Sequence, residues 1–134
     1  MKRSIIFCTV LLLACAGCGG GGSGKRDLPS PVKTSLPDNL PEDVVVYPGA
    51  EVESAYTAPA GGTLKLFTAD DFAKVVEYYE AELPARGWEI PAGSPQEDQA
   101  TFHCIRDKAR FQTVNIRAGS KTQISISFGD NPSQ

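Results

Sequence analysis

Apolar and polar residues alternate most regularly near the end of the chain, within residues 113–117 and 123–128. The apolar positions there are Val114, Ile116, Ile124, Ile126 and Phe128. Such alternation predicts strands of a sheet that has one buried face and one face in water. We expect strands at residues 100–106, 111–118 and 122–128, joined by gaps that suit hairpin loops.

The spacing of apolar residues changes to that of a helix in residues 69–83. Intervals of three and four place one stripe on a single helical face, formed by Phe72, Val75, Val76, Tyr79 and Leu83. Thr68 is expected to cap the start of this helix, and Pro84 to end or kink it near Leu83. Gly87 is expected to provide a left-handed stop, after which Trp88 closes the end of the core.

Shorter signals complete the predicted domain. Residues 44–47 are β-branched and aromatic, and residues 51–57 and 63–67 read as further strands. The sequence therefore predicts an α+β domain at residues 40–129. It is a two-layer sandwich with one helix packed on a mainly antiparallel sheet, in the order β-β-α-β-β-β, and residues 88–90 are an additional candidate strand.

The first 18 residues differ from the rest in composition. Lys2 and Arg3 precede a short apolar run that ends in small residues, which is the layout of a secretory signal. The run is shorter than the ~20 residues that a membrane-spanning helix needs. If the signal is removed, 13 basic residues fall to 11 against 16 acidic ones, and the net charge changes from -3 to about -5. This acidic balance argues against nucleic-acid binding, which depends on Lys and Arg.

Cys15 and Cys18 end this signal in the sequence LLLACAGC. The residues before each cysteine resemble the lipobox of bacterial lipoproteins, in which Leu, a small or aliphatic residue and then Ala or Gly precede Cys. The resemblance implies transfer of a diacylglyceryl group to one of these sulfurs, cleavage before that residue and anchoring in a membrane through acyl chains. Leu12, three places upstream, favours Cys15, whereas Cys18 has a cysteine at that position.

Two other interpretations of the cysteine pair remain. A plain secretory signal would discard both residues. A CxxC redox pair is disfavoured because a glycine tract, and not the start of a helix, follows Cys18. The lipobox resemblance implies a place in the cell envelope, with the lipid anchor outside the cytoplasm. Neither candidate has Asp second after the cleavage site, so in a cell with two membranes the sorting pattern resembles that of proteins on the periplasmic face of the outer membrane.

Residues 19–39 are rich in Gly and Ser and then in Pro, which predicts a flexible tether, and residues 130–134 read as a tail. A second resemblance involves Tyr47-Pro48-Gly49-Ala50, the helix at 76–83 and Gly87-Trp88. This arrangement is similar to a recurrent domain of uncharacterised bacterial lipoproteins. The resemblance implies the fold and the location, and it implies no activity.

Candidate catalytic chemistry is sparse. His103 is expected on a strand face with no positioned partner, and Cys104 on the opposite face as a small buried hydrophobe. If Cys15 carries the lipid, a disulfide between Cys18 and Cys104 remains open. The helix carboxylates lack the spacing of a calcium loop, so no metal and no cofactor is predicted. The chain is therefore interpreted as a protein without enzymatic activity.

The polar face of the predicted sheet is the remaining candidate site. Its side chains are Thr113, Asn115, Arg117, Gln123, Ser125 and Ser127. Arg117, Gln123 and Asn115 are the predicted binding residues, for an envelope protein, a peptide or a glycan; an ordinary wet face is the alternative. The leading function is a membrane-anchored interaction or envelope-accessory module. The alternative is a small-ligand-binding lipoprotein that uses a gap between helix and sheet.

Overall fold

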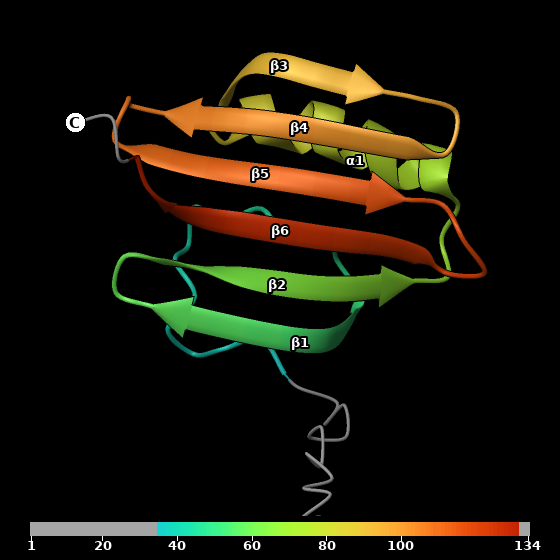
Figure 1. Cartoon of the computed structure of the whole chain (residues 1–134), viewed down its shortest axis with the longest axis horizontal. Helices are drawn as coiled ribbons and strands as arrows, with labels where there is room; N and C mark the ends of the chain where they lie inside the picture. Colours follow the sequence, from blue (N-terminus) through green and yellow to red (C-terminus); the bar gives the residue numbers. More distant parts are fainter. Residues whose placement is uncertain (1–34, 132–134) are drawn as a thin grey trace, which may run out of the picture.

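The computed structural model describes residues 35–131 and shows one antiparallel sheet with a single helix on one face (Figure 1). Helix α1 (Phe72–Ala85) separates two strands from four. The strands are β1 (Glu51–Ala58), β2 (Gly61–Thr68), β3 (Glu89–Pro95), β4 (Gln99–Arg106), β5 (Arg110–Arg117) and β6 (Thr122–Asp130). The predicted α+β class is confirmed, and the additional strand after the helix is present as β3.

The strands lie in the order β1-β2-β6-β5-β4-β3. After β2 the chain leaves the sheet, passes along α1 and re-enters at the opposite edge as β3 (Figure 1). Strands β3 to β6 then return one beside the next until β6 pairs with β2. The first hairpin and the last strand of the chain are therefore neighbours in the middle of the sheet.

The space between the helix and the sheet is filled by one cluster of apolar side chains. The predicted alternation is confirmed, because Val114 and Ile116 of β5 and Ile124 and Ile126 of β6 are fully buried. The predicted helical stripe is confirmed as well, through the buried residues Val75, Val76, Tyr79 and Leu83. Trp88 is buried at the end of the cluster, as expected. Figure 1 looks onto the other face of the sheet, which no helix covers.

The ends of α1 differ from the prediction. Asp71 and not Thr68 occupies the N-cap position; the Thr68 hydroxyl instead accepts a hydrogen bond from the Asp70 N–H at 3.2 Å and shapes the preceding loop. The helix continues past Pro84 to Ala85, because a proline near the end removes only one backbone donor and bonding resumes at Arg86. Gly87, with φ at +80°, ends it in the left-handed conformation that was predicted.

The strand predicted at residues 44–47 is wrong. This segment has no strand pairing, although Val44, Val45 and Tyr47 are buried. The physical reason lies in Gln112 of β5, a buried polar residue. Its side-chain nitrogen donates to the Val45 carbonyl at 3.1 Å, and its side-chain oxygen accepts from the Val45 N–H at 3.1 Å. A side chain thus supplies both hydrogen bonds that a neighbouring strand would otherwise make.

Residues 39–47, which we call the strap, form the second half of the layer that covers the sheet. Figure 1 places this part of the chain behind β1, β2 and β6, whereas α1 lies behind β3, β4 and β5. Trp88 donates from its indole nitrogen to the Asp43 carbonyl at 2.9 Å, and the Tyr78 hydroxyl donates to the Val46 carbonyl at 3.2 Å. The strap is therefore attached to the helix through Tyr78, to β5 through Gln112 and to the loop between α1 and β3 through Trp88.

Candidate functional site: a pocket at the end of the sandwich

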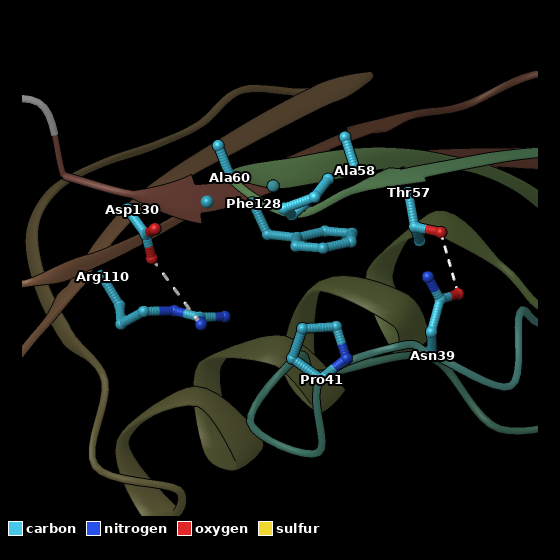
Figure 2. A pocket seen from close by; sticks show the side chains of 11 residues that line it. Asn39, Pro41, Thr57, Ala58, Ala60, Arg110, Phe128 and Asp130 are labelled. Carbon is cyan, nitrogen blue, oxygen red and sulfur yellow. Dashed lines mark hydrogen bonds and ion pairs between the residues drawn. The ribbon is translucent and has the colours of Figure 1, made fainter.

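A hollow of about 250 Å³ lies at one end of the sandwich, where the strap meets the β1–β2 turn (Figure 2). We call it the end pocket. Asn39 and Pro41 of the strap form one wall, and residues 57–61 at the β1–β2 turn form another. Arg110 at the start of β5 and residues 128–130 at the end of β6 complete it. Four separate parts of the chain therefore meet at this pocket.

Two glycines allow the turn to lie close against β6. A Cβ on Gly129 would lie 2.6 Å from the carbonyl oxygen of Ala60, and a Cβ on Gly61 would collide with the backbone of Phe128. Gly61 also has a φ of +152°, which side-chain-bearing residues rarely adopt. Because both positions lack a side chain, the Asp130 N–H can donate to the Ala60 carbonyl at 3.1 Å. This bond holds the rim of the pocket in place.

The pocket has two apolar sides and two polar ends. Figure 2 shows the ring of Phe128 on one side and the ring of Pro41 on the opposite side. Arg110 and Asp130 lie together at one end, and Asn39 and Thr57 at the other. The lining is therefore mixed, and the polar groups at its two ends contribute at least as much to the open surface as the apolar side chains.

The polar groups of the pocket retain unused hydrogen-bond donors. Arg110 donates from Nη2 to Asp43 at 3.1 Å, whereas its Nη1 lies 3.9 Å from Asp130, which is an ion pair without a hydrogen bond. The Nη1 protons of Arg110 are therefore the donors at this end, since its Nε, which also has no partner within residues 35–131, is buried away from the hollow. Thr57 donates to the side-chain oxygen of Asn39 at 2.9 Å, so both N–H groups of the Asn39 side chain remain able to donate to a ligand. Donors are therefore present at both ends.

The residues predicted as a binding site also come together, on the uncovered face of the sheet. Arg117 of β5 pairs in register with Gln123 of β6, and Asn115 pairs with Ser125. They line a second hollow of about 240 Å³, which we call the outer hollow, with Gln99 from β4. Asn115 and Arg117 are exposed and Gln123 is half-buried. Arg117 is the single charged residue that lines this hollow. No ion pair joins it to another of the described residues.

The two residues considered for chemistry lie apart from both hollows. His103 is exposed on the outer face, and its Nδ1 lies 3.3 Å from the Thr113 hydroxyl. Cys104 points into the core, where burial raises the pKa of its thiol to about 12. The thiol therefore stays protonated at neutral pH and acts as a small apolar side chain.

A hydrogen-bonded pair connects the end of the strap to the loop before α1. The buried Tyr47 hydroxyl donates to Asp70 at 2.6 Å, and Lys74 lies 3.0 Å from the same carboxylate. Burial, followed by the bond to Asp70, raises the pKa of Tyr47 to about 12. The bonds from Tyr47 and Lys74 lower the pKa of Asp70. These groups stabilise the charged carboxylate and hold two segments together.

Some predicted features lie outside the described residues, namely Cys15, Cys18 and most of the tether. Within residues 35–131, no helix is long and apolar enough to cross a membrane, and no group of three or more His, Cys, Asp or Glu residues is arranged to hold a metal ion.

The end pocket is not among the sites predicted from the sequence. The predicted ligand site was a gap between helix and sheet, and core side chains fill that space. Asn39 was assigned to the tether and Asp130 to the tail, although both line the pocket. The one sequence signal that points to this pocket is the pair Gly61 and Gly129, because a glycine at each position allows the backbones of the β1–β2 turn and β6 to approach closely.

The comparison with protein families adds one finding. Residues 50–131, which are more than half of the chain, match a family described as START domain-like. The chain belongs to this START domain-like family. The START domain-like region contains all six strands and α1, and it begins after the strap. Membership suggests a ligand-binding domain. No curated protein and no solved structure matches the chain.

Proposed function

We propose that this protein is a lipid-anchored, non-catalytic binding protein of the cell envelope, and that its START domain-like domain holds a small ligand in the end pocket. The observation that carries the proposal is a hollow formed by four parts of the chain, in which Nη1 of Arg110 and the amide nitrogen of Asn39 make no hydrogen bond within the described residues. Family membership supports ligand binding independently of this geometry. The lipobox resemblance before Cys15 or Cys18 supports the anchor.

The residues that line the end pocket favour binding over catalysis. Neither His nor Cys is among them, so the pocket lacks the side chains most often used as general base or nucleophile. Its volume of about 250 Å³ lies just below the usual range for drug-sized ligands, which begins at about 300 Å³. We therefore propose a small ligand that is bound and released without chemical change.

A fragment screen by NMR on the full chain in detergent micelles tests this function. Binding fragments should shift the amide signals of residues 57–61 and 128–130. Asn39→Ala should weaken binding because it removes a donor from the pocket, whereas Asn115→Ala, a matched change on the outer face, should leave it unaltered. Shifts confined to the outer face, or equal effects of the two variants, would contradict the assignment to the end pocket.

The outer hollow supports a second candidate function, the docking of an envelope protein, a peptide or a glycan. The observation in its favour is that Arg117, exposed and without an ion-pair partner among the described residues, lies beside the amides of Asn115 and Gln123. Interface hot spots are enriched in arginine. Arg117→Ala combined with Gln123→Ala should abolish the pattern of crosslinked partners in intact cells without a change in melting temperature. An unaltered pattern of crosslinked partners would contradict docking at the outer hollow and would identify this face as ordinary solvent-exposed surface.

A further inference from the structure

The open sheet has two edge strands, which differ in whether another strand can pair with them. Strand β3 contains Pro91 and Pro95, and its register with β4 is interrupted between Glu89 and Ala92. Prolines and irregularities of this kind block pairing at an edge, because they remove or misplace backbone hydrogen-bonding groups. Strand β1, at the opposite edge, contains no proline (Figure 1). A further strand can therefore pair beside β1 but not beside β3.

One part of β1 is regular and uncharged. The register with β2 shifts between Val52 and Ser54, so the pairing is continuous from Ser54 to Ala58. We call residues 54–58 the open edge; their sequence is Ser-Ala-Tyr-Thr-Ala. Among residues 35–131, only β2 makes backbone hydrogen bonds with this segment. Its remaining N–H and C=O groups point away from the sheet, where a strand of another chain can bond to them.

The open edge carries an exposed aromatic side chain at its centre. Tyr56 is 66% exposed, more than any other large apolar side chain among residues 35–131. It lies on the uncovered outer face, because the adjacent Ala55 pairs with the buried Leu64 and so faces the core. A single exposed aromatic ring is ordinary on a protein surface. Beside an unpaired strand edge it indicates a contact surface, since tyrosine is enriched among the residues that contribute most to interfaces.

We propose that the open edge pairs with the open edge of a second copy of this chain, antiparallel and about a twofold axis at Tyr56. In this register Ser54 lies opposite Ala58, and both face outward. Ala55 lies opposite Thr57, and both face the layer that covers the sheet. Small side chains therefore meet small ones, and each residue stays on its own face. The two Tyr56 side chains lie opposite each other on the outer face, and such aromatic cross-strand pairs stabilise a sheet.

The distribution of charge favours contact between two copies at the open edge. The chain is acidic, so two copies repel each other over most of their surface. Glu51 and Glu53, the carboxylates of β1, lie outside the open edge. They are paired with Lys121 at 2.9 Å and with Lys65 at 2.7 Å, respectively. The register about Tyr56 therefore places no like charges opposite each other. A twofold contact requires a self-complementary patch, and the two halves of the open edge are alike in size and uncharged.

Disulfide trapping of the full chain in detergent tests the position of the twofold axis. Residues directly opposite each other in an antiparallel pair have Cα atoms about 4.5 to 5.5 Å apart, which a disulfide can bridge. Tyr56→Cys should therefore give at least about tenfold more covalent dimer than the parent under mild oxidation. Ala92→Cys is the matched control, because Ala92 is exposed on β3 at the other edge, and it should give no more than the parent. Mass spectrometry of the digested dimer identifies the linked residues.

Charge variants test the same contact without a covalent bond. The paired segment is short, so we expect a weak dimer that forms in concentrated protein. Tyr56→Lys removes the aromatic pair and places two like charges opposite each other. It should weaken self-association by about tenfold in analytical ultracentrifugation of the full chain in detergent. Ala92→Lys adds the same charge to β3 and should leave self-association unchanged. Both positions are exposed, so circular dichroism should show an unaltered fold.

Three results would contradict pairing at the open edge. The first is a level of covalent dimer in Tyr56→Cys that does not exceed that of the parent. The second is a covalent dimer linked through other cysteines. The third is self-association that persists in Tyr56→Lys but is lost in Ala92→Lys, which would place the contact at β3. None of these results bears on ligand binding in the end pocket, which the fragment screen tests separately.

Discussion

At the scale of single residues, Gln112 contributes to the fold in a way that no apolar residue could replace. It sits at an inward-facing position of β5 and is fully buried. Its amide satisfies both backbone groups of Val45 at 3.1 Å. Buried polar groups are tolerated where they are hydrogen-bonded, and an unpaired one is costly. Gln112 therefore determines where the strap crosses the sheet.

Gln112→Ala should lower the free energy of unfolding by about 2 to 5 kcal/mol, because it leaves two buried backbone groups without partners. Gln123→Ala changes the same residue type on the outer face and should stay within about 0.5 kcal/mol of the parent. Urea denaturation followed by circular dichroism measures both. Equal losses would mean that the strap is not held by Gln112.

The pair formed by Tyr47 and Asp70 makes part of the stability depend on pH. The pKa of Asp70 is lower in the folded state than its ordinary value, chiefly because the Tyr47 hydroxyl donates to the carboxylate. For a carboxyl group of this kind, the stabilisation is present above its ordinary pKa of about 4 and is lost as the pH falls through the lowered folded value.

Tyr47→Phe should therefore move the folded-state pKa of Asp70 upward, toward its ordinary value. The dependence of stability on pH below about 4 should become shallower. NMR titration of the Asp70 carboxyl carbon measures the first effect, and denaturation at several pH values measures the second. Tyr78→Phe is the control, because the Tyr78 hydroxyl donates to the Val46 carbonyl and not to Asp70. A pKa of Asp70 that is equal in parent and Tyr47→Phe would refute the account.

At the scale of elements, α1 and the strap share the task of covering the sheet. The helix contributes a stripe of buried side chains, and the strap contributes Val44, Val45 and Tyr47. Aromatic contacts connect the two, since the ring centroids of Tyr47 and Tyr78 lie 4.9 Å apart in an edge-to-face arrangement. The Tyr47-Pro48-Gly49-Ala50 sequence thus has a structural role at the junction.

Leu83→Ala should cost about 2 to 5 kcal/mol of stability, because Leu83 is fully buried near the end of α1. Glu80→Ala lies on the exposed face of the same helix and should change stability by no more than about 0.5 kcal/mol. Thermal and urea unfolding of both variants provide the comparison. If the two changes cost the same, the buried face of the helix has been assigned incorrectly.

The sheet and helix could be predicted because their signals are local. The alternation around Val114 and Ile124 indicates which face of each strand is buried, and short loops set the pairing that joins Arg117 to Gln123. The strap could not be predicted, because its conformation depends on Gln112, a residue 67 positions away from Val45. Its β-branched composition reflects burial alone. Strand β3 is harder to recognise because it contains Pro91, Gly93 and Pro95.

The end pocket was beyond prediction for the same reason. Asn39, Thr57, Arg110 and Asp130 come from the strap, β1, β5 and β6, and only the completed fold brings them together. None of them belongs to a recognisable motif in the sequence. The outer hollow, in contrast, is built largely from one hairpin, so its residues could be named in advance.

At the scale of the whole molecule, the strap follows the predicted tether directly, so one wall of the end pocket belongs to the segment that leads to the proposed lipid anchor. The ligand site and the attachment would thus share a continuous stretch of chain. The strap also precedes the START domain-like region, which begins at residue 50. Asn39 and Pro41 therefore lie outside the residues that match the family.

The proposed anchor predicts that the full chain becomes labelled by a palmitate analogue in cells and partitions into detergent. Cys15→Ser should abolish labelling if Cys15 is the modified residue, and Cys18→Ser should abolish it if Cys18 is. Gel fluorescence after labelling reports the result. Labelling that persists in the double variant would refute the anchor, and Cys104→Ser serves as a control because that thiol is buried.

The position of β6 has a consequence for the order in which the molecule can fold. The last strand of the chain lies between β2 and β5, so the early hairpin has no partner on its inner edge until the final residues are available. Pairings between distant parts of a chain form slowly, since the connecting segment must first be ordered. A ribosome-bound or partly exported chain therefore cannot complete its sheet. If the chain is exported as proposed, this delay would favour an unfolded polypeptide until β6 becomes available.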